Sequence, residues 1–422
     1  MRGPRADSPR IDRRGLLRTA SAVGAAGLLG GPVAGAQGSH FPFDADGEIR
    51  RGPTVVNGTV YVGTRGSVVH AVDAESATET WRFELDEIPA GAPCVVDALL
   101  FVGDLSGTVY AVDAATGDEV WRERPDTAVW NIQPDRRRLK VRTSPTVADG
   151  TVYVGTEKAV YALDAATGEK QWHFTVGGSA AEFVHCSSPT VVDGTVYIVR
   201  DHTVARLYAL DAETSDVVWK RDVGGFPAWS SPTVADGRVV VGNSEGGVYA
   251  FDAASGEERW HAPTEEGVAS SPTIANGRVF VGANDHHLYA LDAASGDELW
   301  RRDLELAVIA SPTVADGVVY IGSGTGTLHA FEAASGDTET TWDLPRGAWS
   351  SPIVADGHVY VGDMAGNLHR FGTSAGGASE GSRVELGTLG HHGDWRYADQ
   401  SIRASETATA TTTETATASP CE

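Results

Sequence analysis

The residues of this 422-residue chain that could do chemistry include two familiar patterns. Residues 242–246 match the G-x-S-x-G pattern of a serine nucleophile, and His286-His287 follows Asp285 as in some metal sites. The serine pattern works on a strand-to-helix elbow, whereas here it lies in a turn between two predicted strands. Adjacent histidines on a strand point to opposite faces, and no carboxylate spacing completes a metal site. We therefore expect no catalytic residue and no bound metal.

A third group is a basic cluster with a neighbouring aromatic residue. Trp130 precedes Arg136–Arg138 and Arg142 on a chain whose formal net charge is −24. Without residues 1–36, the chain has 27 basic and 55 acidic side chains, a net charge of −28. Such a surface argues against nucleic acid, which needs a basic footprint, and makes the cluster a candidate for binding anions. The acidic, lysine-poor composition resembles that of proteins from extreme halophiles, and an acidic mesophile is the alternative.

A repeated unit must position these residues, and residues 144–174 show it most clearly. Four short strands are predicted at residues 144–148, 151–155, 160–163 and 170–174. Asp149-Gly150 is typical of a type I′ hairpin turn, because both positions need positive φ. The segment from Asp164 to Gly168 predicts a second tight turn. Trp172 lies in the fourth strand.

The unit recurs about eight times. The prolines that open it are 40–52 residues apart, at Pro53, Pro93, Pro145, Pro189, Pro232, Pro272, Pro312 and Pro352. Four-stranded units with this period predict an all-β fold, an eight-bladed β-propeller. Phe41 lies 12 residues before Pro53, as Trp81 lies 12 residues before Pro93. We therefore expect residues 41–49 to supply the missing fourth strand of the last blade and close the ring.

The repeated motifs resemble those of a known family. SPTVADGTVYVG followed by YALDAATG and a tryptophan is similar to the pyrroloquinoline-quinone (PQQ)-like repeat, over residues 41–372. The resemblance implies that one large aromatic residue per repeat docks between adjacent blades: Phe41, Trp81, Trp121, Trp172, Trp219, Trp260, Trp300 and Trp342. The family includes quinone dehydrogenases and non-enzymatic scaffolds, so the fold alone does not fix the function.

The innermost strands should carry a ligand site at one mouth of the central channel. The residues three positions before each proline are Arg50, Ala90, Arg142, Cys186, Trp229, Ala269, Ile309 and Trp349. Two long loops, residues 122–143 and 173–187, are expected on the same face, where function tends to concentrate. The candidate binding residues are Trp130, Arg136, Arg137, Arg138, Arg142, Cys186, Trp229 and Trp349. Arginine and tryptophan favour an anionic or aromatic ligand. The alternatives are a plugged channel and loops without a function.

The two ends of the chain have different compositions. Arg13-Arg14 resembles a twin-arginine signal, and Ala34-Gly35-Ala36 fits a cleavage site. We expect a signal peptide at residues 1–36, the propeller at 37–372, and a linker with a short extension at 373–404. Residues 405–422 are rich in Thr, Ala and Glu and should be disordered. The protein is then extracellular or associated with the cell surface, and an uncleaved basic N-terminus is the alternative.

The expected function is binding or scaffolding without catalysis and without a cofactor. The resemblance implies that quinone dehydrogenases carry neighbouring cysteines against their cofactor, whereas Cys94 and Cys186 fall in non-adjacent repeats. We expect a monomer that binds a protein or a small anionic or aromatic ligand, with no transmembrane span. A quinone-dependent dehydrogenase and a cell-surface adhesion or sensory ectodomain are the alternatives.

Overall fold

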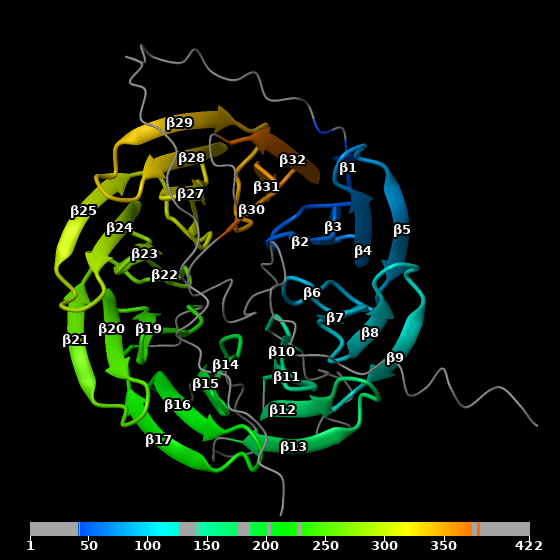
Figure 1. The fold of residues 1–422 in the computed structure, drawn as a ribbon, viewed down its shortest axis with the longest axis horizontal. Coiled ribbons are helices and arrows are strands. Elements are labelled where there is room, and N and C mark those ends of the chain that lie inside the picture. The colour runs from blue at the N-terminus through cyan, green and yellow to red at the C-terminus, as the bar shows by residue number, and fades with distance from the viewer. Residues whose placement is uncertain are drawn as a thin grey trace, which may run out of the picture. The chain divides into compact units, whose positions relative to one another are not determined.

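The computed structural model describes residues 41, 43–125, 141, 143–157, 159–175, 186–200, 204–225, 230–373 and 378–379. Within these ranges, the chain forms 32 strands and no helix, so no helix there could cross a membrane. The strands make eight four-stranded antiparallel sheets, arranged as blades around a central axis (Figure 1). The predicted eight-bladed β-propeller is confirmed.

Each blade runs from an inner to an outer strand. Blades 1 to 4 contain β2 (Thr54–Val56), β3 (Thr59–Thr64), β4 (Val68–Asp73), β5 (Glu79–Glu84); β6 (Cys94–Val96), β7 (Leu99–Gly103), β8 (Val109–Asp113), β9 (Glu119–Glu123); β10 (Thr146–Ala148), β11 (Thr151–Gly155), β12 (Ala159–Asp164), β13 (Lys170–Thr175); and β14 (Thr190–Val192), β15 (Thr195–Arg200), β16 (Arg206–Asp211), β17 (Val217–Asp222). Blades 5 to 8 contain β18 (Thr233–Ala235), β19 (Arg238–Asn243), β20 (Gly247–Asp252), β21 (Glu258–Pro263); β22 (Thr273–Ala275), β23 (Arg278–Gly282), β24 (His287–Asp292), β25 (Glu298–Asp303); β26 (Thr313–Ala315), β27 (Val318–Gly322), β28 (Thr327–Glu332), β29 (Thr338–Asp343); and β30 (Ile353–Ala355), β31 (His358–Gly362), β32 (Asn367–Gly372), β1 (Phe43–Asp44).

Turn chemistry fixes the blades in the way that the sequence predicts. Asp149 and Gly150 have φ values of 47° and 73°, as a type I′ hairpin requires. In the next turn, the Asp164 carboxylate accepts the backbone N–H groups of Ala166 and Thr167 at 3.1 and 2.8 Å. The middle strands are buried on both faces, because every blade is covered by two neighbours.

The N-terminal segment closes the ring, as expected. Strand β1 lies beside β32 (Figure 1). The two strands pair antiparallel, with Phe43 opposite Leu368. Strand β1 is only two residues long, shorter than the expected segment 41–49, and Ile49 beyond it donates its N–H to Asp363 O of blade 8 at 3.1 Å. Phe41 is buried in one cluster with Val55 and Tyr360, so blades 8 and 1 share a core.

Six of the expected docking tryptophans lie in equivalent positions between blades. Each indole Nε1 donates to an alanine carbonyl of the following blade at 2.8–3.2 Å: Trp81 to Ala114, Trp121 to Ala165, Trp172 to Ala212, Trp219 to Ala253, Trp260 to Ala293 and Trp300 to Ala333. Each indole ring thus fills the space between two blades, and its N–H satisfies a backbone carbonyl group of the following blade.

Trp342 packs between blades 7 and 8, as expected, but at a position along the strand that differs from that of the other docking tryptophans. In blade 6, Trp300 pairs with Ala290, whereas in blade 7 Thr340 takes the equivalent place opposite Ala330. The tryptophan of blade 7 lies ten residues after Glu332, the first residue of the turn, whereas Trp300 lies eight residues after Asp292. Trp342 is therefore two positions further along its strand. It remains buried and stacks on Phe371 of blade 8, with ring centroids 5.4 Å apart.

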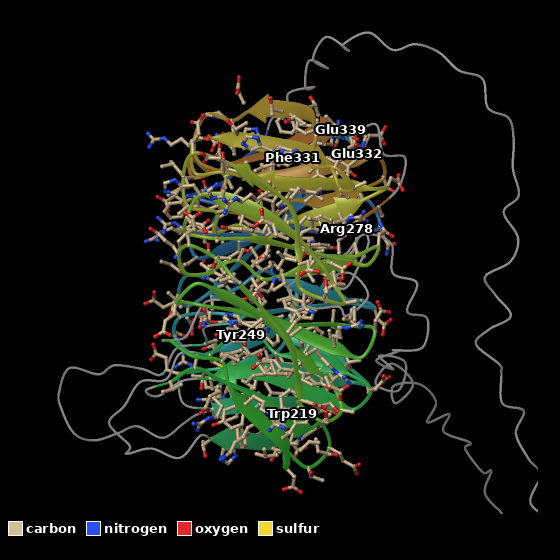
Figure 2. The ribbon with its side chains drawn as sticks, turned by 90° about the vertical axis from the view of Figure 1, so that its left-hand side faces the viewer. Trp219, Tyr249, Arg278, Phe331, Glu332 and Glu339 are labelled. Carbon is tan, nitrogen blue, oxygen red and sulfur yellow. The ribbon has the colours of Figure 1, made fainter. Side chains whose placement is uncertain are left out.

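The turns divide between two faces of the ring. In Figure 2, which views the blades from the rim, Arg278 and Glu332 lie toward the same side. Arg278 follows a first turn and Glu332 begins a third turn, so these turns share a face as expected. After blade 8, Ser379 returns to the inner strand, where its N–H donates to Val354 O at 2.8 Å and its Oγ accepts Val354 N–H at 2.7 Å.

Candidate functional site

A belt of hydroxyl groups holds the inner strands together around the axis. In blades 3 to 8, the residue before the repeat proline is a serine, and its Oγ accepts the N–H of the equivalent residue in the preceding blade at 2.9–3.1 Å. These links run Ala92 to Ser144, Ser144 to Ser188, Ser188 to Ser231, Ser231 to Ser271, Ser271 to Ser311 and Ser311 to Ser351. These links form a frame that ties blades 2 to 8 to one another at the mouth of the channel.

This frame surrounds a central pocket of about 520 Å³ to which all eight blades contribute. Six of the eight residues predicted at the mouth line it: Arg50, Ala90, Cys186, Ala269, Ile309 and Trp349. The structure therefore brings together residues that are up to 299 positions apart in the chain. Arg142 and Trp229, the other two, lie outside the described residues, as do Trp130 and Arg136–Arg138.

The strongest chemical feature of the pocket is an arginine over a tryptophan. The Arg50 guanidinium lies 5.2 Å from the Trp349 ring centroid, within the range of a cation–π contact. The Arg50 Nε is 2.7 Å from the Glu48 carboxylate, which also lies 3.5 Å from the Arg65 Nε. Glu48 thus orients both guanidinium groups and leaves the lining with an excess of positive charge.

Sequence reasoning missed several lining residues that come from the second turns and the loops between blades. Arg51 and Arg65 add positive charge on the side of blade 1, and Leu105 adds apolar surface. On the side of Trp349, the exposed Leu306 lies close by, because a Cβ on Gly324 would be 3.3 Å from Leu306 and 3.5 Å from the Trp349 Nε1. The charged residues Glu48, Arg50 and Arg51 are close together in the sequence and include a mouth position, so they could have indicated the charged side of the pocket.

Cys186 lines the pocket but stands one position out of register with the equivalent residue of blade 2. Its backbone forms an isolated bridge with Arg200, as Pro89 does with Asp104. Pro89 stands four positions before its repeat proline and Cys186 only three, so blade 4 is one residue shorter here. Cys186 and Cys94 are both free thiols. Burial raises the pKa of the Cys186 thiol to about 11, against the opposing effect of the Arg200 charge, which disfavours the reactive thiolate.

The two patterns that resemble catalytic or metal sites have structural roles. Asp285 accepts the Tyr289 hydroxyl at 2.7 Å and the backbone N–H of His287, so it caps its turn. Asn243, in the serine pattern, donates its Nδ2 to Val223 O at 2.8 Å. In the described part of the chain, no group of three or more His, Cys, Asp or Glu residues could hold a metal ion.

Comparison with known families agrees with this architecture. A model of the PQQ-repeat type, described as outer membrane protein assembly factor BamB, matches residues 31–129, 90–228, 205–310 and 287–416. The chain belongs to this family. The crystal structure of BamB from Moraxella catarrhalis superposes with a TM-score of 0.65 at 18% identity, and covers 78% of this chain and 98% of that one. At that identity, the likeness concerns the fold.

Relatives of the BamB-like repeats occur in proteins with different functions. The serine/threonine-protein kinase AfsK of Streptomyces griseus is 32% identical over 128 residues, which are 29% of this chain and 15% of the kinase. The quinohemoprotein alcohol dehydrogenase ADH-IIG of Pseudomonas putida is 30% identical over 157 residues, 33% of this chain and 21% of the enzyme. This chain therefore spans a small part of the relatives that it matches, and the shared repeats do not decide between binding and catalysis.

Proposed function

We propose that this chain is a non-catalytic binding module whose central pocket holds a ligand with both an anionic and an aromatic group. The observation that carries the proposal is the placement of Arg50 over Trp349 in a pocket lined by all eight blades. An anionic group would meet Arg50, Arg51 and Arg65, while an aromatic ring would stack on Trp349 beside Ile309. Arginine and tryptophan are the residue types that most often dominate binding surfaces.

The electrostatic setting supports an anionic ligand. The formal net charge of −24 repels anions from most of the surface, so a local excess of arginine selects where an anion binds. Glu48 accepts the Nε–H of Arg50 at 2.7 Å, and an anionic ligand would be met by the other donors of this guanidinium group. In high salt, long-range attraction is screened, and stacking on Trp349 would carry more of the affinity.

We extend the proposal to an exported protein that works outside the cell or at its surface. Support comes from the Arg13-Arg14 pair, the Ala34-Gly35-Ala36 segment and the acidic composition that resembles proteins of halophiles. The family description refers to an outer membrane assembly factor, which is consistent with a scaffold outside the cytoplasm. Replacement of Arg13 and Arg14 by lysine should leave the precursor inside the cell. Secretion at the wild-type yield would contradict this part of the proposal.

A quinone-dependent dehydrogenase is the second candidate, because several relatives are quinoprotein alcohol dehydrogenases. The described residues do not fit the quinone as the family binds it. Cys94 and Cys186 are free thiols in blades 2 and 4, and no carboxylate cluster in the described ranges could hold the accompanying metal ion. We therefore assign no step of an oxidation to these residues.

The experiment uses an aromatic anion, 1-anilinonaphthalene-8-sulfonate, as the probe and its fluorescence as the measure of binding. We expect saturable binding that weakens about tenfold in Trp349→Ala and in Arg50→Met. The control variant carries Asp236→Ser and Asp316→Ser in the first turns of the opposite face, and should bind as the wild type does. Equal binding by all variants would contradict the site. A stoichiometric bound chromophore after addition of the quinone with calcium would instead support the dehydrogenase.

A further inference from the structure

Arg200, the last residue of β15, is a buried arginine without a partner among the residues that the structure describes. Within those residues, its side chain has 0% exposure, and none of its Nε, Nη1 and Nη2 atoms has a hydrogen-bond partner. The guanidinium group of an arginine stays charged in proteins, so neutralisation does not remove the cost of burying it. A buried charge needs a counter-charge and hydrogen-bond acceptors. The guanidinium group of Arg200 therefore needs a hydrogen-bond acceptor with a negative charge.

The same position in other blades shows that it accommodates a buried negative charge. In most repeats, this position comes directly after the glycine near the end of the second strand of the blade. In blades 2 and 8 it holds a fully buried aspartate, Asp104 and Asp363. Asp104 accepts the N–H groups of Ser106 and Thr108 and the Tyr110 hydroxyl at 2.9–3.1 Å. Blade 4 thus reverses the charge at a place where two other blades bury a carboxylate.

The neighbours of Arg200 place it behind the wall of the central pocket. Cys186 lies directly opposite Arg200 across the antiparallel bridge, so the two side chains stand on the same face of blade 4. That face looks toward blade 3, because a Cβ on Gly155 would meet the Cys186 Sγ at 2.6 Å. Cys186 also lines the central pocket. One thiol side chain therefore stands between the pocket and the interface that holds Arg200.

We propose that Arg200 binds a small anion, a halide ion or a carboxylate group, at the upper end of the interface between blades 3 and 4. The anion supplies the negative charge that Asp104 and Asp363 carry at the same position in their own blades. The guanidinium presents five donors in a plane, which suits either a spherical halide or the two oxygens of a carboxylate. This site is separate from the Arg50–Trp349 contact, and its occupancy does not depend on the proposed ligand of the pocket.

The first test measures the unfolding temperature of the full chain while chloride replaces a bulky sulfonate buffer anion at constant ionic strength. An anion that binds only the folded protein stabilises it in a saturable way, according to its concentration relative to its Kd. We expect saturable stabilisation by chloride in the wild type, and none in Arg200→Met. Arg200→Met should also be at least as stable as the wild type without chloride, because it no longer buries an unpaired charge. Sodium acetate as a second probe distinguishes a carboxylate from a halide.

Arg206→Met is the matched control. Arg206 lies opposite Arg200 in the β15–β16 pair but forms an ion pair with Asp222, so it needs no external anion. This variant should keep the full response to chloride. An equal response in Arg200→Met and the wild type, or no saturable response to either anion in the wild type, would overturn the proposal, the latter showing that Arg200 is satisfied within the chain or by water.

Cys186 provides a second readout that does not depend on stability. In a Cys421→Ser background, iodoacetamide labelling of Cys186 is followed by peptide mapping, which also monitors the fully buried Cys94. An anion beside Arg200 reduces the positive charge that favours the thiolate, and we expect labelling up to about tenfold slower with chloride. In Arg200→Met, labelling should be slow and independent of chloride. A chloride effect that persists in this variant would contradict the assignment even if Arg200→Met is less stable than expected.

Discussion

Between blades 5 and 6, Trp260 fills the interface, donates to Ala293 O at 3.1 Å, and lies against Gly296. Between blades 8 and 1, Phe41 takes the docking position, and its side chain has no N–H to donate. The equivalent acceptor, Ala74 O, instead receives a hydrogen bond from Arg370 of β32, whose guanidinium lies 5.0 Å from the Phe41 ring centroid. The seam between blades 8 and 1 therefore keeps the acceptor of the regular interface and changes the donor.

The turn residue that faces the docking ring differs in the same way. Gly296 has a φ of 78°, and a Cβ there would lie 2.7 Å from the Trp260 indole. At the seam, Ala77 takes that place with a φ of 58° and is buried in one cluster with Phe41. A phenyl ring occupies less space than an indole, so the Ala77 methyl group fits beside it. The indole interfaces are not uniform at this position, because Ser215, with a φ of 66°, stands in the turn that receives Trp172.

The largest effect should come from removal of the closing segment. Deletion of residues 41–49 removes β1, Phe41 and the buried Ile49, and exposes the edge of β32 and the core of blade 1. We expect loss of the cooperative unfolding transition, or aggregation, measured by circular dichroism and size-exclusion chromatography. Deletion of residues 405–422 is the control and should leave the transition unchanged. A folded monomer after the first deletion would mean that the regular interfaces alone hold the ring.

Truncation of a regular docking residue should have the next largest effect. Trp260→Ala removes a side chain that is only 7% exposed, and should lower the free energy of unfolding by about 3–5 kcal/mol. The measurement is chemical denaturation followed by fluorescence of the remaining tryptophans. Val120→Ala is a control on the exposed rim and should cost less than about 0.5 kcal/mol. A cost below about 1 kcal/mol for Trp260→Ala would show that the indole does not fill the interface.

The regular parts of the ring could be predicted from sequence because most repeats have the same turn residues at the same spacing. Asp149-Gly150 specifies a hairpin, and the interval from turn to Trp specifies the docking register. The rule failed at Trp342, where two more residues in the strand shift the register and place Thr340 opposite Ala330. The interval between Phe41 and Pro53 located the seam. It could not predict the role of Arg370, because this donor lies on β32 and not on the strand that carries the docking residue.

The candidate site was predictable to a smaller extent. Counting back from each proline identified Arg50 and Trp349 as mouth residues, since the inner strands all start in the same register. It did not identify Arg65 or Leu105, because residues in second turns reach the pocket through tertiary packing and not through a repeated spacing. Arg200 is conspicuous only by its missing partners, which no pattern in one sequence reveals.

Two single substitutions compare the space beside the docking ring at a regular interface and at the seam. Gly296→Ala adds a methyl group at positive φ against the Trp260 indole and should destabilise the protein by about 1–3 kcal/mol. Ala77→Gly relieves the positive φ but loses some buried surface, and should change stability by less than about 1 kcal/mol. Thermal and chemical denaturation give both values. Equal costs for the two substitutions would show that the ring size at the seam is irrelevant.

A double-mutant cycle tests whether Arg370 replaces the indole N–H. Arg370→Met leaves Ala74 O without its donor and should cost about 1–2 kcal/mol. Phe41→Trp combined with Ala77→Gly restores the residue pair of the regular interface, and should recover most of that cost in the Arg370→Met background. The coupling energy from denaturation is the measurement. Additive effects would show that the guanidinium and the ring act independently, and would contradict the comparison.

The smallest expected effect is a pH dependence that Asp363 contributes at the seam. Asp363 lies in the turn of blade 8 that receives β1, whereas blade 7 has the uncharged Ser323 at the same position. Burial alone would favour the neutral acid, but hydrogen bonds from Asn367 and His369 outweigh it and hold the pKa of Asp363 below its usual range. Because the pKa is lower in the folded than in the unfolded state, the ionised carboxylate stabilises the protein fully above about pH 4–5. This contribution is lost as the pH falls through the lower, folded-state value.

Asp363→Asn should therefore destabilise the protein near pH 7 by about 1 kcal/mol, and this difference should shrink as the pH falls below 4. Denaturation curves at pH 7, 5, 4 and 3, at constant ionic strength, measure it. Ser323→Ala is the matched control: it removes the Ser323 hydroxyl bonds to Thr325 and Thr327 but no charge, so its cost should not change over the same range. A constant difference between Asp363→Asn and the wild type from pH 7 to 3 would mean that the ionised carboxylate does not stabilise the seam. The turn would then be held by its backbone hydrogen bonds, as in blade 6, where Ala283 has no side-chain acceptor and the Val308 N–H still donates to Ala283 O at 3.0 Å.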